Sequence, residues 1–333
     1  MPDAIVAEAA GARAVAAPSP AGAALASVAM RVPEGRIRNA ELAPLLGVEE
    51  GWILARTGVR ERRIAADGER LAPLAGAAAT DALAAAAVDP GDVDLVLVAT
   101  VTADDVMPNA APLVAGEIGA THAAAIDVGA ACTGFLSALA VGTAWLEAGR
   151  AQTVVVVGAD IMSRLVNPTD RGTRSLFGDG AAACVLKAVG APGRVGPVVM
   201  GCDPAASRLV TASREPCSMR MEGQETYRLA VAHLVEVTRG ACAAAGTALE
   251  DIDLFLYHQA NGRILRAVGD RLGLDPARVV NSIERYGNTS AASIPIALAE
   301  AARGGRLAAG TKVLLGAFGA GMTWGGVVVE WGA

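Results

Sequence analysis

An internal repeat constrains the fold of this chain more than any other feature. The stretch DVDLVLVAT, which starts at Asp92, is echoed by DIDLFLYHQ, which starts at Asp251. The segment 132–159 then has a counterpart in 288–317: a polar residue opens a helix, a Gly-Arg turn follows, and an aliphatic strand ends in Gly-Ala. Since both pairs keep nearly the same spacing, we predict two copies of one structural unit.

Within the first copy, apolar strand signals alternate with alanine-rich helical stretches, at 94–100, 123–128, 153–159 and 181–188. This alternation predicts α/β layering. The helix after Cys132 is apolar on all sides, so we expect it to be buried on all sides. Its counterpart from Asn288 is rich in small residues, with Pro295 in its first turns or at a kink. Two buried helices, each followed by a core strand, imply helices sandwiched between two sheets.

The chain divides into three parts on this basis. Residues 1–24 are rich in Ala, Pro, Gly and Ser without periodicity, which predicts a flexible arm, with ordered structure from about Leu25. Residues 25–190 form the N-terminal half, which carries the cysteine. Residues 191–333 form the C-terminal half, which carries the histidine and asparagine discussed below.

Charge and hydropathy exclude several classes of protein. The net charge of −6 does not favour a nucleic-acid partner. The longest aliphatic run, 154–157, is far shorter than the roughly 20 residues that cross a bilayer, and 1–25 is unlike a secretion signal. We therefore expect a cytoplasmic protein with no membrane partner. The five cysteines show no CxxC spacing, so neither disulfides nor a metal site is expected.

Cys132 is the candidate nucleophile. It follows a short strand and begins a helix, where free backbone N–H groups and the helix dipole should stabilise a thiolate. From this position alone, a small buried hydrophobic residue is an equally good interpretation. The remaining cysteines lack a comparable setting: Cys184, Cys202, Cys217 and Cys242.

His258 and Asn288 are the candidate partners of the cysteine. His258 ends an apolar strand, where its side chain can project into a cleft, whereas His233 is interpreted as a packed or surface residue and His122 has no evident partner. Asn288 stands in the second copy where Cys132 stands in the first, so two-fold symmetry would bring them together. Without the repeat, the Asn-Thr-Ser stretch would be read as a helix cap. With it, we favour a Cys, His, Asn constellation.

The motifs around these residues resemble β-ketoacyl-acyl carrier protein synthase III, of the thiolase-like condensing-enzyme superfamily. They are DVGAACTGF, YHQANGRIL, YGNTSAASIP and AFGAGMTWG, with further likeness in EEGWILARTGVRERRIA, NPTDRGTRSLFGDGAAA and MEGQETYRLAV. The resemblance runs in order from about Leu25 to the C terminus. It implies a five-layered αβαβα sandwich of two pseudo-symmetric halves that works as a homodimer.

The resemblance also implies a chemistry. Cys132 would take an acyl group from acyl-coenzyme A. His258 and Asn288 would then stabilise the enolate left when malonyl-acyl carrier protein loses CO2, and backbone N–H groups of Cys132 and Ala320 would hold the oxyanion. Attack of the enolate gives a β-ketoacyl thioester that starts a fatty acid or polyketide chain. No metal or redox cofactor is required.

Binding residues follow from the same resemblance. Trp52 and Arg56 match the residues that sandwich the adenine of coenzyme A, with Arg171 helping. Arg263 matches the residue that docks the acidic carrier protein, and Arg266 could extend this basic patch. Met107 matches the position from which a family residue reaches across the dimer into the acyl pocket of the partner subunit.

Departures from the family pattern keep alternatives open. Ala320 stands where the glycine turn often has Gly, so its Cβ could narrow the oxyanion region or demand an unfavourable backbone angle. The segment 201–218 is shorter than its family counterpart and unlike it. Acyl transfer to a hydroxyl, amine or carrier thiol without condensation is therefore a second hypothesis. A non-catalytic partner subunit is disfavoured because Cys132 is retained, and the acyl primer is not identified.

Overall fold

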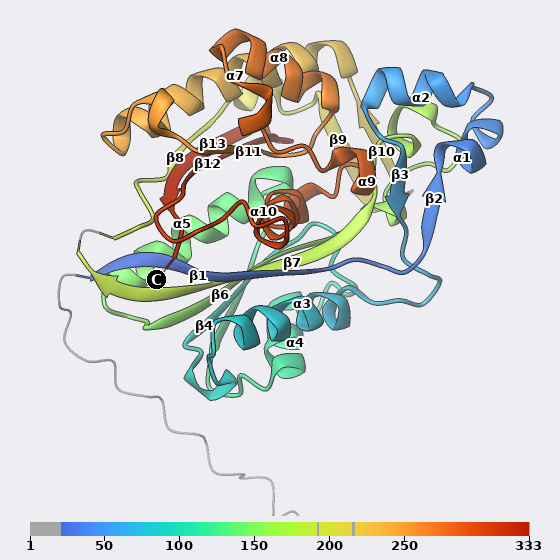
Figure 1. Cartoon of the computed structure of the whole chain (residues 1–333). Coiled ribbons are helices and arrows are strands. Elements are labelled where there is room, and N and C mark those ends of the chain that lie inside the picture. The colour runs from blue at the N-terminus through green and yellow to red at the C-terminus, as the bar shows by residue number, and fades with distance from the viewer. Residues whose placement is uncertain (1–20, 192, 215–216, 333) are drawn as a thin grey trace, which may run out of the picture.

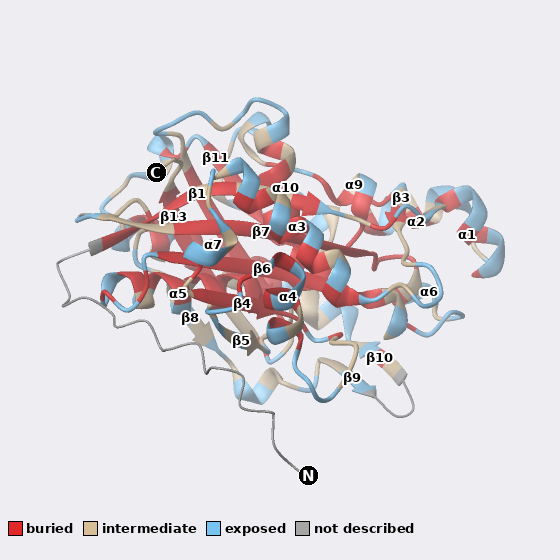
Figure 2. Cartoon of the chain, turned by 90° about the horizontal axis from the view of Figure 1, so that it is seen from below, coloured by how far each residue is buried: buried red, intermediate tan, exposed pale blue. Residues whose placement is uncertain are grey.

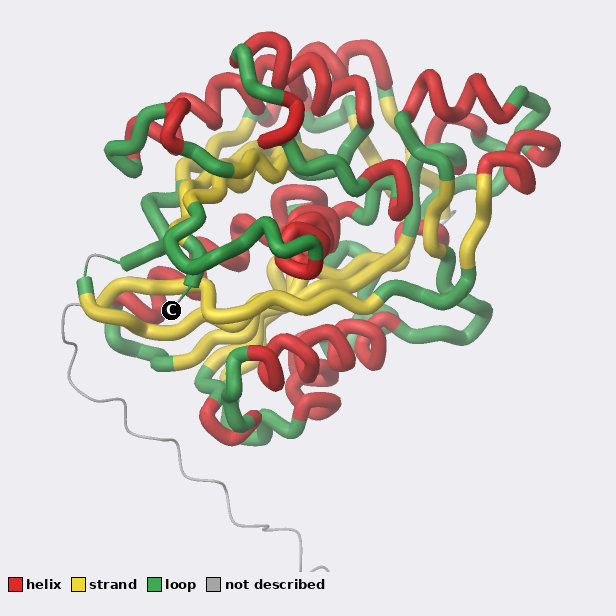
Figure 3. The backbone as a smooth tube through the Cα atoms, in the orientation of Figure 1, coloured by secondary structure: helices red, strands yellow, loops and turns green. Residues whose placement is uncertain are grey.

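Five layers of alternating helices and sheets make up the computed structural model, which describes residues 21–191, 193–214 and 217–332 (Figure 1; Figure 3). Two helices cover the outer face of the first sheet, two lie between the sheets, and two cover the second sheet. The predicted αβαβα sandwich is thus confirmed. In layer order these helices are α3 (Leu71–Ala85), α4 (Ala110–Ile118), α5 (Gly134–Glu147), α10 (Ser293–Arg303), α7 (Gly223–Ala244) and α8 (Gly262–Leu272).

The first sheet has the strand order β1-β7-β6-β4-β5, with β4, β5 and β6 parallel and β1 and β7 antiparallel to their neighbours. Strand β1 starts earlier than the expected Leu25, and residues 1–20 of the expected arm lie outside the described residues. The bounds are β1 (Ala21–Arg31), β7 (Asp179–Gly190), β6 (Thr153–Ile161), β4 (Leu95–Ala99) and β5 (Ala124–Val128).

The second sheet repeats this plan in the order β11-β12-β13-β8. Strands β11 and β12 are parallel, and β13 and β8 are antiparallel to their neighbours, as in the first sheet. Val279 forms a parallel bridge to Phe255 of β11, in the place that β5 takes beside β4. The bounds are β11 (Leu254–Tyr257), β12 (Lys312–Gly319), β13 (Thr323–Glu330) and β8 (Val199–Cys202).

The structural register of the repeat differs from the one predicted at the active site. The central helices begin at Gly134 and Ser293, and each follows a one-turn 3-10 helix, η2 (Ala131–Thr133) or η7 (Ser290–Ala292). This alignment puts Ala291, rather than Asn288, at the position equivalent to Cys132. The prediction was wrong because it equated the two polar residues before the helices, whereas Asn288 precedes its 3-10 turn and Cys132 lies within one.

The central helices α5 and α10 lie between the two sheets (Figure 1). Helix α10 is almost wholly buried, whereas α5 exposes Val141 and Ala144, so burial of α5 on all sides is confirmed only in part. Figure 2 shows that the strands of the first sheet are mostly buried. Leu136 and Leu139 of α5 share one core cluster with Ile294 and Leu298 of α10. Burial of each such side chain contributes about 1.5–3 kcal/mol. Pro295 lies in the first turn of α10, where a missing N–H costs no helix hydrogen bond.

Elements outside the repeated plan gather at one end of the sandwich, beside α8 and β7 (Figure 1). The buried Arg62 ties them together, since its guanidinium donates to Asn39 Oδ1 (2.9 Å) and to the Ser175 carbonyl (2.6 Å). None of the helices in the described ranges is long and apolar enough to cross a membrane. These elements are β2 (Arg36–Arg38), α1 (Asn39–Leu45), α2 (Glu50–Thr57), β3 (Glu61–Arg63), α6 (Arg171–Arg174), β9 (Val210–Arg214), β10 (Cys217–Met221) and α9 (Ile283–Tyr286).

Candidate active site

A cavity of about 480 Å³ lies between the two halves of the molecule and the added elements, and residues from all three line it. Its lining includes Cys132, His258 and Asn288, so the structure brings the three predicted residues to one place. Trp52 and Arg56 line the same cavity, and Arg56 is exposed whereas His258 and Asn288 are buried. The cavity therefore runs from the surface at α2 to the ends of β11 and β12 in the interior.

Cys132 lies in the turn η2, just before α5, and is half-buried. Its Sγ is 3.8 Å from Ser290 Oγ in the matching turn η7. Burial, with a smaller contribution from the charge of Asp160, raises the pKa of the Cys132 thiol to about 12, although Ser290 and nearby backbone N–H groups oppose the shift. The stabilised thiolate therefore stays a prediction, which desolvation opposes and the local dipoles support.

The end of β12 packs directly on the candidate nucleophile. A Cβ on Gly319, the last residue of this strand, would lie 2.7 Å from Cys132 Cβ, so only glycine fits. The next residue, Ala320, directs its backbone N–H toward the cysteine sulfur, and Cys132 N–H does the same. The expected strain at Ala320 is not found: its φ is not positive, and the left-handed position falls on Gly321 (φ 137°). An alanine is therefore compatible with this turn.

His258 follows the last residue of β11 and is 1% exposed. Its backbone N–H donates to the Gly316 carbonyl of the neighbouring strand (2.7 Å), which fixes the side chain at the sheet edge. Burial lowers the pKa of His258 to about 3, so the imidazole is neutral near pH 7. Within the described residues, Nδ1 is buried without a hydrogen-bond partner. That leaves Nε2 as the nitrogen that can meet a substrate in the cavity.

Asn288 is held through both its backbone and its side chain. Its N–H donates to the Leu176 carbonyl (2.9 Å), and its carbonyl accepts from Gly178 N–H (3.0 Å). The side-chain Oδ1 accepts the backbone N–H of Ser290 (2.9 Å). Because Oδ1 is already engaged, the Nδ2 amide is the group that is left to donate into the cavity.

An aromatic and basic cluster forms the cavity mouth. The guanidinium carbons of Arg56 and Arg171 lie 5.4 and 5.7 Å from the centre of the Trp52 ring. The two arginines come from different added elements, α2 and α6. A planar ring with positive charge beside it suits a flat, phosphate-bearing ligand.

Sequence and structure comparisons agree on the family of this chain. Models for 3-oxoacyl-[acyl-carrier-protein (ACP)] synthase III and for its C-terminal region match residues 126–204 and 242–331. The chain is 43% identical to β-ketoacyl-[acyl-carrier-protein] synthase III 2 of Streptomyces coelicolor, over 93% of this chain and 94% of that protein. It is 42% identical to the synthase III of Gloeobacter violaceus, over 90% and 96%.

This protein belongs to the β-ketoacyl-acyl carrier protein synthase III family. Solved structures give the same answer: the synthase III of Pseudomonas aeruginosa superposes with a TM-score of 0.89 at 39% identity, covering 94% of this chain and 99% of that one. The priming β-ketosynthase of the R1128 polyketide biosynthetic pathway superposes at 0.91 with 34% identity, covering 95% and 98%. Members of the family are condensing acyltransferases, so the non-catalytic hypothesis is excluded.

The residues predicted for carrier-protein docking and for the dimer contact lie at the surface of this synthase III. Arg263 lines the cavity mouth, with its guanidinium carbon 5.4 Å from the centre of the Tyr227 ring. Arg266 is exposed on the same helix, α8, but outside the cavity. Met107 is 83% exposed and is not part of the cavity lining within one chain.

Several residues at the site escaped the sequence analysis. Ser290 contacts Cys132, and Asp160 lies behind Ser290. An acidic residue after the apolar run 154–157 was the available signal for Asp160. The apolar lining residues carried no motif of their own. They come from α7, the β9–β10 hairpin, the end of β12 and the turn after it: Val210, Met221, Tyr227, Phe318 and Met322.

Cys184, Cys202, Cys242 and His233 lie outside the cavity lining, and the side chain of Cys217 is not among those that the structure describes. His233 packs as interpreted, with its ring stacked on Trp324 at 3.7 Å. Cys184 and Cys242 are buried, and burial raises the pKa of both thiols. Among the residues that the structure describes, no cluster of His, Cys, Asp and Glu could hold a metal ion.

Proposed function

We propose that this enzyme primes chain synthesis by a decarboxylating Claisen condensation between an acyl-coenzyme A and malonyl-acyl carrier protein. The observation that carries the proposal is the meeting of a thiol with two neutral hydrogen-bond donors in one cavity. Cys132 supplies the nucleophile, and His258 and Asn288 supply the donors. Simple acyl transfer would need only the thiol and its oxyanion donors.

In the first half-reaction, the Cys132 sulfur attacks the carbonyl carbon of the acyl thioester. The carbonyl oxygen becomes an oxyanion, for which the backbone N–H groups of Cys132 and Ala320 are the proposed donors, because both already point at the sulfur. Collapse of this intermediate breaks the bond to the coenzyme A sulfur. The acyl group then waits on Cys132 as a thioester of similar free energy.

In the second half-reaction, malonyl thioester loses CO2 and its electron pair moves into an enolate. The negative enolate oxygen accepts hydrogen bonds from His258 Nε2 and Asn288 Nδ2. A histidine that burial keeps neutral suits this role, since a charged imidazolium would protonate the enolate. The enolate carbon attacks the acyl carbonyl, a carbon–carbon bond forms, and the Cys132 sulfur leaves. No electrons pass to a cofactor in either half-reaction.

The two carrier groups reach the cavity through its mouth. We assign the adenine end of coenzyme A to Trp52, with Arg56 and Arg171 beside it. We assign the acidic carrier protein to the exposed face of α8, through Arg263 and Arg266. An acidic enzyme needs a local basic surface to attract an acidic partner.

We further propose that the enzyme is a homodimer in which Met107 enters the acyl pocket of the partner subunit. Val106 and Met107 are 71% and 83% exposed, a high exposure for neighbouring apolar side chains. They precede α4, whose first residue Ala110 donates its backbone N–H to Asp127 of the edge strand β5 (2.9 Å). Light scattering after size-exclusion chromatography tests the dimer. The dimer should be lost or weakened in Met107→Asp. It should be kept in the control Met200→Asp, because Met200 is also exposed (54%) but lies on β8 of the second sheet.

The experiment that tests the reaction supplies a panel of acyl-coenzyme A primers with malonyl-acyl carrier protein and weighs the products. Condensation adds a two-carbon unit and releases CO2, whereas simple transfer moves the acyl group unchanged. Cys132→Ala is the matched inactive control. Acylated carrier protein without CO2 release would favour the transfer hypothesis instead. No product with any primer would refute both.

A further inference from the structure

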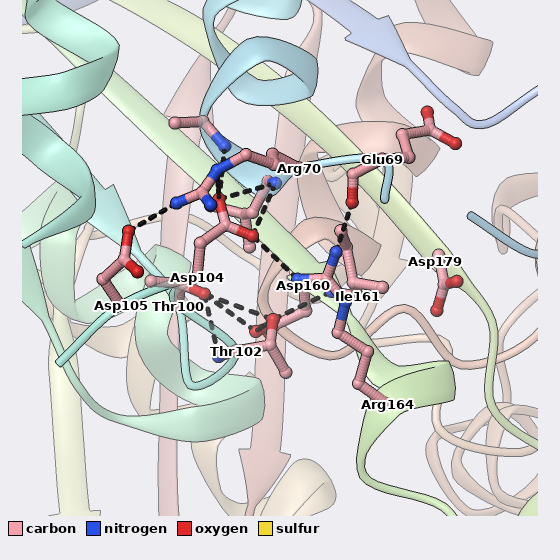
Figure 4. A network of polar contacts seen from close by, with 12 residues as sticks. Glu69, Arg70, Thr100, Thr102, Asp104, Asp105, Asp160, Ile161, Arg164 and Asp179 are labelled. Carbon is pink, nitrogen blue, oxygen red and sulfur yellow. Dashed lines mark hydrogen bonds and ion pairs between the residues drawn. The ribbon is translucent and has the colours of Figure 1, made fainter. Parts of the chain in front are cut away.

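A buried carboxylate lies behind the nucleophile, and the reaction outlined above does not use it. Asp160, near the end of β6, is fully buried. Its Oδ1 accepts hydrogen bonds from Thr100 Oγ1 (3.0 Å), Val101 N–H (2.9 Å) and Thr102 Oγ1 (2.9 Å), and its Oδ2 accepts from Ala291 N–H (3.1 Å). Figure 4 shows Asp160 with the two threonines. All of these donors are neutral, which is a costly setting for a carboxylate that only holds strands together.

Ser290 connects this carboxylate to the cysteine. Its Oγ lies 3.8 Å from Cys132 Sγ. The Ser290 hydroxyl also faces Asp160, where its interaction with the carboxyl group lowers the pKa of that acid. Ser290 also has a positive φ of 50°, an angle that non-glycine residues rarely adopt. The Asp160 bond to Ala291 N–H fixes the same turn from the next residue. Backbone strain held in place by a buried acid is typical of a functional site.

The Ser290 hydroxyl can accept one hydrogen bond and donate another in this arrangement. When Ser290 donates its proton to Asp160, its oxygen is free to accept the S–H of Cys132, so the three groups form a chain in one direction. Burial makes the thiolate costly, with the thiol pKa raised to about 12. The thiol must therefore lose its proton while the sulfur attacks, rather than before.

We propose that Ser290 and Asp160 form a proton relay that takes the Cys132 proton during acylation. As the bond between Sγ and the acyl carbon forms, the S–H proton moves to Ser290 Oγ and the Ser290 proton moves to the Asp160 carboxylate. When the bond to the coenzyme A sulfur breaks, that sulfur leaves with the electron pair. The proton returns through Ser290 to the departing thiolate, so no proton or electron is gained or lost.

The surroundings of Asp160 suit a temporary proton acceptor. Burial raises the pKa of Asp160, although the hydrogen bonds to it oppose this. Other ionisable groups nearby are engaged elsewhere: Asp179 on β7 binds Ser163, and Asp104 pairs with Arg164 at 2.7 Å. His258 lines the cavity and is neutral, whereas Asp160 lies behind the lining and faces Cys132 through the Ser290 hydroxyl.

The inference rests on the proposed function, because it concerns the acylation half-reaction. It is tested by single-turnover acylation, with rapid quenching and intact mass measurement, from pH 7 to 9 in the absence of carrier protein. In the native enzyme the rate should be constant over this range. In Asp160→Asn and Ser290→Ala it should fall about 10²-fold at pH 7 and then rise about tenfold per pH unit, because only pre-formed thiolate can react.

Thr102→Val is the matched control, since it removes one donor to Asp160 but leaves the relay intact; its profile should stay flat. The proposal is overturned if a folded Asp160→Asn or Ser290→Ala enzyme acylates at the native rate, or is slower by one constant factor at every pH, as a purely structural role predicts. If Asp160→Asn does not fold, Ser290→Ala decides. A native enzyme that forms no acyl adduct with any primer would refute the proposed function itself.

Discussion

Gly319 lies so close to Cys132 that a Cβ on the glycine would be 2.7 Å from the cysteine Cβ and 3.1 Å from its backbone nitrogen. The C-terminal half thus sets the position of a nucleophile that belongs to the N-terminal half. The contact joins the end of β12 to the turn η2, and it makes the geometry of the thiol sensitive to a residue with no reactive group.

Replacing this glycine should therefore impair catalysis. We expect Gly319→Ala to lower the rate of Cys132 acylation on the order of 10²-fold, because a displacement of about 1 Å at a reacting atom has that effect. Acyl-enzyme formation followed by mass spectrometry measures it. Gly129→Ala is the control, since a Cβ there meets nothing within 4 Å, and its rate should stay near the native value.

The amide of Asn288 should matter only in the second half-reaction. Asn288→Asp keeps the shape of the side chain but sets a negative oxygen against the enolate, so decarboxylation of malonyl-acyl carrier protein should fall about 10²–10³-fold. Release of CO2 reports this rate, while Cys132 acylation should change less than about threefold. The exposed Asn167→Asp is the matched control. Equal loss in both half-reactions would contradict the assigned role.

His258 should make the stability of the fold depend on pH. Below pH 6.5 the unfolded chain binds a proton at His258, whereas the native chain does not until about pH 3. Because the unfolded state binds more protons in this window, the free energy of unfolding should fall as the pH falls, by about 2 kcal/mol from this residue between pH 6.5 and 5.

Urea titrations of the native protein and His258→Gln measure this contribution as the difference between their stabilities at each pH. That difference should be constant above pH 7 and should shift in favour of the variant as the medium becomes acidic. A difference that does not vary with pH would mean that His258 is not held neutral in the native state.

The ring of Trp52 should contribute to binding of the nucleotide end of coenzyme A. Loss of one base–aromatic stack costs about 1–3 kcal/mol, so Trp52→Ala should weaken acyl-coenzyme A binding about tenfold or more. Isothermal titration measures the affinity. An acyl-pantetheine substrate, which lacks the adenine, serves as the control: its kcat/KM should be the same in both proteins, and a matching loss would place the defect elsewhere.

The basic patch on α8 should distinguish carrier protein from coenzyme A. Arg263→Glu with Arg266→Glu should raise the KM for malonyl-acyl carrier protein at least tenfold and weaken its dependence on salt, because charges at the rim of an interface steer association. The KM for acyl-coenzyme A should change far less. The exposed Arg150→Glu, at the far end of α5, is the control for a general change in charge.

Much of the architecture could be predicted because it repeats. The paired segments at Asp92 and Asp251 became β4 and β11, and the apolar helices became α5 and α10 between the sheets. The register at the active site could not be predicted in the same way. A 3-10 turn before each helix moves the equivalent of Cys132 to Ala291, and sequence similarity does not reveal turns of this kind.

The chemistry of the site could likewise be predicted only in part. Residue type and the period of the repeat are written in the chain, so they predicted a thiol, an imidazole and an amide as the reacting groups, with each half supplying its share. The protonation of these groups and their hydrogen-bond partners depend on the folded arrangement. Burial keeps Cys132 a thiol and His258 neutral, and packing of β6 against η7 sets Asp160 behind Ser290. Desolvation and contact depend on what surrounds a residue in space, which no stretch of sequence contains.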